Sequence, residues 1–258
     1  MSLYVETLGA GPDLVLLHGW GLDGAVWGPA VPYLDAGPGG RRRLSIVDLP
    51  GHGFSPAPPE GFALEGAARA VAAAVPPGAV WLGWSLGALV ALAAALAGAP
   101  VAGLILTGAT PRFTRAPDWP AALEPAVLEA FAADLERDPE ATLRRFLSLQ
   151  TRGAEGARAT LRALRSGGLR RAAAQPAALR GGLEVLRTAD LRARLAHLRI
   201  PVTVISGARD TLVPPAASEA LAAAVPGAGH VLIPGAGHAP FLSHPQAFAA
   251  AVAGSARA

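Results

Sequence analysis

The chain of 258 residues contains no cysteine, and only 16% of its residues are charged. Without cysteine it can form no disulfide and can offer neither a thiol nucleophile nor a thiolate metal ligand, which fits a reducing compartment. So low a charged fraction, beside 52% hydrophobic residues, disfavours disorder and a coiled coil. We therefore expect a compact globular protein with a sizeable core.

A strong excess of one charge is also missing. Lys and Arg together number 22 against 19 Asp and Glu, a formal net charge of +3, and all 22 of these cations are arginine. A balance this close to neutral does not indicate a nucleic-acid partner. A local cluster of arginine could still attract an acidic partner.

Signals for secretion or membrane insertion are absent as well. The segment Met1–Glu6 lacks the basic start and apolar run of a signal peptide, so we expect a cytoplasmic protein. The stretch from Trp84 to Pro111 carries no charge, but Gly98 and Pro100 interrupt it. It is better explained by a helix over Leu86–Leu96 and a buried strand over Val101–Thr107, and we expect no membrane span.

Short apolar runs alternate with helix-like segments along much of the chain. The runs are Leu14–Leu17, Leu44–Val47, Ala79–Leu82, Val101–Leu106, Val202–Ile205 and Val231–Ile233. This alternation is typical of βαβ units and predicts an α/β fold with a mostly parallel central sheet flanked by helices. In such a sheet the loops after the strands gather at one edge, where ligands bind.

The alternation stops between about Pro111 and Arg187. Amphipathic segments such as Leu123–Leu135 and Ala141–Leu149 dominate there, and Arg158–Arg180 is either a pair of helices or a loop broken at Gly167-Gly168 and Pro176. We interpret residues 112–187 as an inserted helical lid. Residues 1–111 and 188–258 would then form the α/β core.

The sequence Gly83-Trp-Ser-Leu-Gly87 fits the pattern G-x-S-x-G and lies between a predicted strand and a predicted helix. A nucleophile elbow needs this context, because small flanking residues allow the tight turn from which the serine projects. Ser85 is therefore the predicted nucleophile. The alternative is a glycine-rich helix start with Ser85 as its cap.

A serine nucleophile needs a base and a residue that orients the base. Among six histidines, His238 is the best candidate, because it follows the last predicted strand in a loop of small residues. A helix should then begin near His244-Pro245. The less favoured histidines are His18, His52, His197, His230 and His244, and His238 could instead be a loop histidine bonded to backbone.

Asp210 follows the strand Val202–Ile205 and is the predicted orienting acid. It could instead be a turn aspartate bonded to its own backbone, and Asp48 also ends a strand, although its surroundings suggest a turn stabiliser. The chain order Ser85, Asp210, His238 is that of α/β hydrolases.

Hydrolysis of an ester also needs an oxyanion hole made of backbone N–H groups. Leu86 would supply one, and Trp20, in the His18-Gly-Trp-Gly-Leu22 loop after an earlier strand, the other. The glycine-rich loops lack a Walker lysine, and the histidines lack metal-ligand spacing. We expect neither a metal nor a cofactor.

Several longer motifs extend these patterns. They are Leu17-His-Gly-Trp-Gly-Leu22, Val47-Asp-Leu-Pro-Gly51, Trp81-Leu-Gly-Trp-Ser-Leu-Gly87, Arg145-Phe-Leu-Ser-Leu-Gln-Thr151, Gly181-Gly-Leu-Glu-Val-Leu186 and His238-Ala-Pro-Phe-Leu-Ser-His-Pro245. With them the chain resembles the α/β-hydrolase superfamily over essentially its whole length. Within that superfamily it resembles the pimeloyl-[acyl-carrier protein] methyl ester esterases of biotin synthesis, and the paired tryptophans are the specific part.

The resemblance implies hydrolysis of a methyl ester on a pimeloyl chain bound to acyl carrier protein, releasing methanol. It implies a substrate site made of Trp20, Ser85, Leu86, Phe146, Leu147, Ser148, Leu149, Gln150 and His238. It further implies that Arg145, Arg158 and Arg162 of the lid face the acidic carrier, with Arg144 and Arg152 nearby, although each could belong to a solvated helix face. Ala88 after the elbow and the Ala/Arg-rich lid depart from the family pattern. We expect a monomer.

Two alternative functions stay open on sequence alone. A broad short-chain carboxylesterase without a carrier partner would have the same core and differ in the lid. A noncatalytic binding protein with a hydrolase fold is disfavoured by the complete set of triad residues.

Overall fold

The computed structural model describes residues 2–36, 40–167 and 173–255. Within these residues seven strands form one sheet, in the order β1-β3-β2-β4-β5-β6-β7. The strands are β1 (Val5–Gly9), β2 (Asp13–Leu17), β3 (Arg43–Val47), β4 (Ala79–Trp84), β5 (Val101–Thr107), β6 (Val202–Gly207) and β7 (Gly229–Ile233). β1 runs antiparallel to β3, and every other neighbouring pair is parallel. The predicted α/β fold with a mostly parallel sheet is confirmed.

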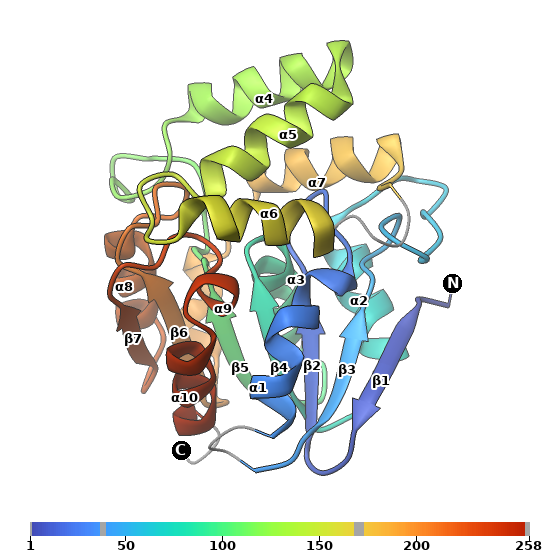
Figure 1. Ribbon diagram of the computed structural model, residues 1–258, viewed down its shortest axis with the longest axis vertical. Coiled ribbons are helices and arrows are strands. Elements are labelled where there is room, and N and C mark those ends of the chain that lie inside the picture. Colours follow the sequence, from blue (N-terminus) through green and yellow to red (C-terminus); the bar gives the residue numbers. More distant parts are fainter. Residues whose placement is uncertain (1, 37–39, 168–172, 256–258) are drawn as a thin grey trace.

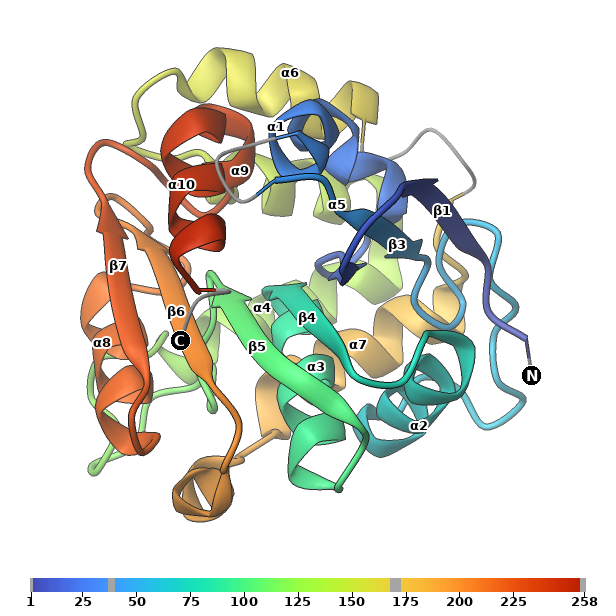
Figure 2. The same ribbon diagram turned by 90° about the horizontal axis from the view of Figure 1, so that it is seen from below.

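Helices cover both faces of the sheet (Figure 2). On one face lie α1 (Val31–Asp35), α9 (Pro240–Ser243) and α10 (Pro245–Ser255); on the other lie α2 (Leu64–Ala74), α3 (Leu86–Leu96) and α8 (Pro215–Ala224). Two short 3-10 helices, η1 (Gly24–Ala30) and η2 (Arg192–His197), complete the core. No helix among the described residues is long and apolar enough to span a bilayer.

The central strands are apolar throughout because both of their faces are buried. In β2, Leu14 and Leu16 join the cluster that contains Trp27, whereas Val15 and Leu17 join the cluster on the other face. All four side chains are fully buried. β1 was not predicted, because this edge strand is only partly buried and has no continuous apolar run.

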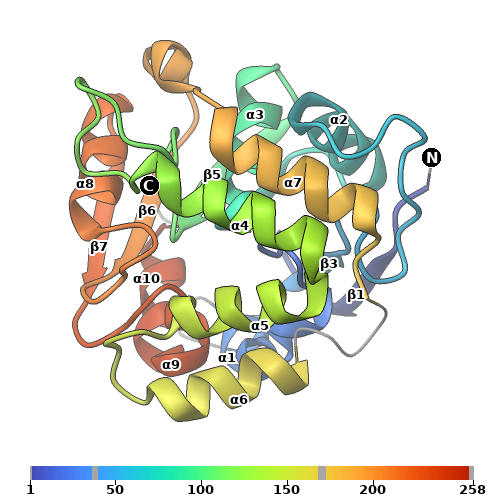
Figure 3. The same ribbon diagram turned by 90° about the horizontal axis from the view of Figure 1, so that it is seen from above.

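Within the described residues, four helices of the segment predicted as a lid lie across the carboxyl ends of the strands (Figures 1 and 3). They are α4 (Pro125–Arg137), α5 (Pro139–Gln150), α6 (Ala157–Gly167) and α7 (Pro176–Thr188). α4 starts at Pro125 rather than at Leu123, because proline favours the first helical turn, and Leu123 pairs with Thr114 instead. Gly168, part of the predicted break, lies outside the described residues.

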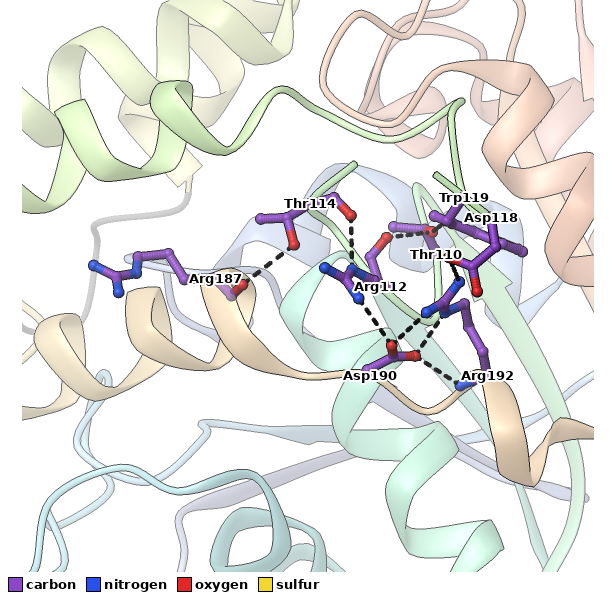
Figure 4. A network of polar contacts seen from close by, with 8 residues as sticks. All are labelled: Thr110, Arg112, Thr114, Asp118, Trp119, Arg187, Asp190 and Arg192. Atoms are coloured by element: carbon purple, nitrogen blue, oxygen red, sulfur yellow. Dashed lines mark hydrogen bonds and ion pairs between the residues drawn. The ribbon is translucent and has the colours of Figure 1, made fainter. Parts of the chain in front are cut away.

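The two chain segments that join the lid to the core are tied together by ion pairs (Figure 4). Asp190, just after α7, accepts hydrogen bonds from Arg112 Nη1 at 3.1 Å and Arg192 Nη2 at 2.7 Å. Arg112 follows β5, so the contact joins the outgoing segment to the returning one. Arg192 also pairs with Asp118 at 2.8 Å. The hydrogen bond from Arg192 lowers the pKa of Asp190 from 3.8 to about 2.

Candidate active site

Ser85 lies at the sharp turn between β4 and α3. Its φ of 56° is the only positive value for a non-glycine residue within the described residues. A Cβ atom on Gly83 would stand 2.5 Å from the Gly87 carbonyl oxygen, and one on Gly87 would stand 2.5 Å from the His18 carbonyl oxygen. Since real Cβ atoms do not approach backbone this closely, only glycine fits at these positions. The tight turn expected from G-x-S-x-G is present.

His238 and Asp210 are brought together from the loops after β7 and β6. Their side chains are fully buried, and His238 Nδ1 lies 2.7 Å from Asp210 Oδ2. The other carboxylate oxygen, Oδ1, accepts the backbone N–H groups of Leu212 at 2.8 Å and Val213 at 2.9 Å. Because an ionised carboxylate can only accept, Nδ1 is the donor in this hydrogen bond.

Two buried polar atoms remain without partners at this edge of the sheet. In the described part of the chain, neither Ser85 Oγ nor His238 Nε2 has a hydrogen-bond partner. Ser85 is 2% exposed and His238 1% exposed, so both are shielded from bulk water. Buried polar atoms are normally satisfied, and such exceptions need a functional or structural explanation. A nucleophile and a base poised for a substrate would supply one.

The other candidates from the sequence have different surroundings. His238 is the only histidine hydrogen-bonded to Asp210 in the described structure. His230 in β7 contacts Ser206 Oγ, His244 contacts Ser243 Oγ, and His197 ends η2. The described residues contain no group of three His, Cys, Asp or Glu side chains that could hold a metal ion.

Asp48 joins two loops, as a turn stabiliser would. Its Oδ1 accepts the Gly24 N–H at 2.7 Å, and its Oδ2 accepts the Phe54 N–H at 2.9 Å. The first of these donors follows the loop that carries Trp20, and the second lies in the loop of Asp48 itself. Asp48 therefore supports the loop after β2 from the side of β3.

The two predicted oxyanion donors lie on either side of the elbow. Leu86 is the first residue of α3, where a backbone N–H has no acceptor within the helix. Trp20 lies in the loop after β2, and a Cβ on its neighbour Gly19 would stand 3.4 Å from Ser85 Cβ. The loop is therefore close enough to the predicted nucleophile for its backbone to face a reacting carbonyl.

A buried histidine supports that loop, a contact that the sequence did not reveal. His18 Nε2 accepts the Leu49 N–H at 2.9 Å, and its Nδ1 lies 2.8 Å from the Gly19 carbonyl oxygen. His52 packs beside it, with ring centroids 5.2 Å apart. Burial lowers the pKa of His52 from 6.5 to about 3, so this ring stays neutral at ordinary pH.

Two of the predicted lid residues reach the site. Phe146 on α5 packs edge-on against Trp20, with ring centroids 4.8 Å apart. The Gln150 carbonyl accepts the His238 backbone N–H at 3.2 Å, and Gln150 Oε1 is buried without a partner among the described residues. Leu147 is buried in the cluster around Trp27, and Leu149 is half-buried.

Ser148 does not join them. It is exposed, and its hydroxyl donates to the Arg144 carbonyl oxygen at 2.9 Å. Successive side chains of an α-helix point in different directions. The side chains of the predicted run Phe146–Gln150 therefore cannot all face one site.

The arginines of the predicted lid differ in whether an acidic side chain neutralises their charge. Arg145 pairs with Asp134 at 2.5 Å and lies 4.4 Å above the Phe131 ring, while Arg144 pairs with Glu140. Arg158 and Arg162 are exposed on α6, as Arg152 is beyond the end of α5. These three have no ion-pair partner in the part of the chain that the structure describes.

One contact at the site involves a residue that sequence analysis used only as part of a motif. The Trp84 indole N–H donates to the His238 carbonyl oxygen at 2.8 Å. The sequence does show a tryptophan, which has a side-chain N–H donor, directly before the predicted nucleophile. It does not show which acceptor that N–H contacts.

A model of the alpha/beta hydrolase family matches residues 14–251, and the chain belongs to that family. It is 47% identical over 250 residues to a pimeloyl-[acyl-carrier protein] methyl ester esterase of Stenotrophomonas maltophilia (strain K279a), covering 97% of this chain and 95% of that protein. It is 46% identical over 242 residues to a protein of the same name from Xanthomonas axonopodis pv. citri (strain 306), covering 94% of each. An esterase structure from Exiguobacterium antarcticum (EaEST) shares the fold, with a TM-score of 0.84 and 23% identity over 99% of this chain and 96% of that one.

Proposed function

We propose that the protein is a serine carboxylesterase that hydrolyses the methyl ester of a pimeloyl chain on acyl carrier protein, releasing methanol, in biotin biosynthesis. The observation that carries this proposal is the 47% identity, over nearly the full length, to a relative named for that activity. The buried contact between His238 and Asp210 supports the chemistry.

In the first half of the reaction, Ser85 Oγ attacks the ester carbonyl carbon while His238 Nε2 takes the hydroxyl proton. Asp210 stabilises the resulting imidazolium and holds its Nδ1–H. The carbonyl oxygen becomes an oxyanion, which the Trp20 and Leu86 N–H groups stabilise. Removing one such donor typically costs about 3 kcal/mol of transition-state stabilisation.

The tetrahedral intermediate then collapses. His238 returns the proton to the methoxy oxygen, the carbon–oxygen bond to methanol breaks, and the acyl group remains on Ser85 as an ester. A water molecule, deprotonated by His238, attacks this acyl-enzyme. Ser85 regains its proton, and the product is a free carboxylate on a chain still attached to its carrier.

The surroundings of the serine suit an acyl chain. Trp20 and Phe146 are both 1% exposed and pack against each other where α5 meets the loop after β2, which makes the surroundings of Ser85 apolar. A pimeloyl chain is mostly methylene, so burial against these rings would favour its binding. Gln150 lies beside His238, and its buried side-chain oxygen has no partner among the described residues, which supports a role in contacting a polar group of the substrate.

Carrier docking is proposed at α6. Arg158 and Arg162 are one helical turn apart, so they share an exposed face, and no acidic side chain in the described residues neutralises them. They would attract an acidic carrier surface. Arg145 is the weaker of the three predicted docking residues, because its charge is already opposed by Asp134.

The test is methanol release from pimeloyl-carrier-protein methyl ester by the wild type and by Ser85→Ala, with a short p-nitrophenyl ester in parallel. We expect rapid turnover of the carrier substrate by the wild type and a loss of about four orders of magnitude or more in the variant. Cleavage of the small ester alone would contradict the carrier proposal and favour a broad carboxylesterase. Cleavage of neither ester would contradict the enzymatic proposal.

A further inference from the structure

The buried tryptophans fall into two groups. Trp20, Trp27, Trp81 and Trp84 are each at most 2% exposed. Trp20 and Trp84 donate their indole N–H groups to backbone carbonyl oxygens, those of Leu179 and His238, both at 2.8 Å. Trp27 and Trp81 have buried indole nitrogens without a partner in the described residues. Burial alone therefore does not account for the two bonded tryptophans.

Trp84 contacts each part of the candidate active site. It directly precedes Ser85, and its ring centroid lies 5.7 Å from that of His238. A Cβ on Gly19, next to Trp20, would stand 3.2 Å from Trp84 Cε3. Its indole therefore fills the space between the elbow, the histidine loop and the loop after β2.

Hydrogen bonds add to close packing in holding the His238 loop. It contains Gly235 and Gly237, and a Cβ on Gly108 would stand 2.8 Å from His238 Cε1, so the ring packs directly against the backbone there. The His238 peptide is held at its N–H by Gln150 and at its carbonyl by Trp84, while Asp210 holds the ring.

We propose that Trp84 is a positioning residue whose indole N–H fixes the His238 backbone so that Nε2 faces Ser85 Oγ. This inference rests on the proposed esterase function, because it assigns His238 the role of base. Without the indole donor, the His238 carbonyl would be buried and unsatisfied, and the loop would shift to find another donor or water. A shift of about 1 Å between reacting groups can cost about 100-fold in rate.

Two variants remove the donor. Trp84→Phe keeps an aromatic ring but is smaller, whereas 3-benzothienylalanine at position 84 replaces the N–H by sulfur and preserves the bicyclic shape. For both we expect kcat on a p-nitrophenyl ester to fall about tenfold or more, with KM within about twofold of the wild type. If Trp84→Phe fails to fold, the benzothienyl variant decides.

The matched control is Trp81→Phe. Trp81 lies on the same strand and is equally buried, but its indole N–H has no partner in the described residues. We expect its kcat to stay within about twofold of the wild type. A benzothienyl variant at position 84 with wild-type kcat would overturn the inference, and so would an equal loss in Trp81→Phe.

A second readout does not depend on turnover. The His238 Nδ1 proton, bonded to Asp210, should give a low-field NMR signal in the wild type. We expect that signal to shift or broaden in the benzothienyl variant and to stay unchanged in Trp81→Phe. An unchanged signal in both would overturn the inference. Because this readout needs no ester, it separates failure of the inference from failure of the proposed function.

Discussion

The edge of the core that carries the candidate triad and the outer face of the predicted lid use polar residues in opposite ways. At the edge, Asp210 is 4% exposed and its carboxylate is bonded to one ring nitrogen and two backbone N–H groups. On the lid, charges such as those of Arg158 and Arg162 project into water from α6. The edge fixes its geometry through burial, whereas the lid leaves charge available to a partner.

Under the proposed function, this difference would separate chemistry from partner choice. Buried hydrogen bonds act at short range and should affect every ester that enters the site, while exposed charges act on association with a charged partner. Changes at the edge should therefore lower activity on all substrates, and changes on α6 should lower activity on the carrier substrate alone. The following predictions test that separation, from the largest expected effect to the smallest.

Asp210→Asn should have the largest effect. An amide oxygen can keep the bonds from Leu212 and Val213, but its NH2 group would then face His238 Nδ1 and favour the wrong tautomer. We expect kcat to fall by about 10³- to 10⁴-fold with small and carrier-bound esters alike. Steady-state assays with both substrates measure this, and Asp13→Asn at the far end of β2 is the control. A loss below about tenfold would argue against the assigned role of Asp210.

The double reversal Arg158→Glu, Arg162→Glu should act on one substrate only. It replaces attraction by repulsion on α6, so kcat/KM for the carrier-bound ester should fall about 10- to 100-fold at low salt, and the p-nitrophenyl ester should be unaffected. Arg69→Glu, an exposed reversal on α2, is the matched control. Equal losses with both substrates would contradict the division between edge and lid.

Gly182→Ala probes where the two regions touch. A Cβ on this α7 residue would stand 2.8 Å from Trp20 Cδ1 and 3.1 Å from Leu86 Cδ2, so α7 or the indole must move. We expect a loss of about 1 to 3 kcal/mol in unfolding free energy, with lower activity on both esters. The helical control Gly66→Ala meets no atom within 4 Å and should gain about 0.5 to 1 kcal/mol. Denaturant unfolding measures the stability of the Gly182→Ala and Gly66→Ala variants, and equal unfolding free energies would contradict this prediction.

His52→Gln should change how the unfolding free energy depends on pH, rather than the catalysed reaction. Burial lowers the pKa of His52 from 6.5 to about 3. Between these pH values the His52 ring binds a proton in the unfolded chain but not in the folded chain. Stability is therefore lost as pH falls from 6.5 towards 3. The wild type should lose about 1.4 kcal/mol more per pH unit than the variant in the lower part of this window. Unfolding at pH 7, 5.5 and 4.5 measures the slopes, and parallel slopes would contradict the buried neutral ring.

The fold and the placement of the candidate triad could be predicted because they depend on local and periodic signals. The helix Leu86–Leu96 and the strand Val101–Thr107 have the predicted bounds. Parallel topology then brings the loops after β4, β6 and β7 to one edge. The contact between His238 and Asp210 follows from that topology, since β6 and β7 are neighbours.

The lid and the supporting contacts could not be predicted in the same way. Which arginine is neutralised depends on how α4 packs on α5, because Asp134 meets Arg145 across two helices. Ser148 and Phe146 are two residues apart, yet one is exposed and the other is 1% exposed. The Trp84 bond to His238 joins residues 154 positions apart, and no local pattern specifies it.

The backbone of Ser85 has a consequence for how this protein can be improved. Its φ of 56° and ψ of −117° are backbone angles that glycine adopts without strain. For a residue with a side chain, this conformation costs about 1 to 3 kcal/mol of folding free energy. Ser85→Gly would release that strain, so the inactive protein should be the more robust one. If Ser85 is the nucleophile as proposed, selection for heat resistance alone would drift towards losing it, and directed evolution of this fold must therefore screen for turnover at every round.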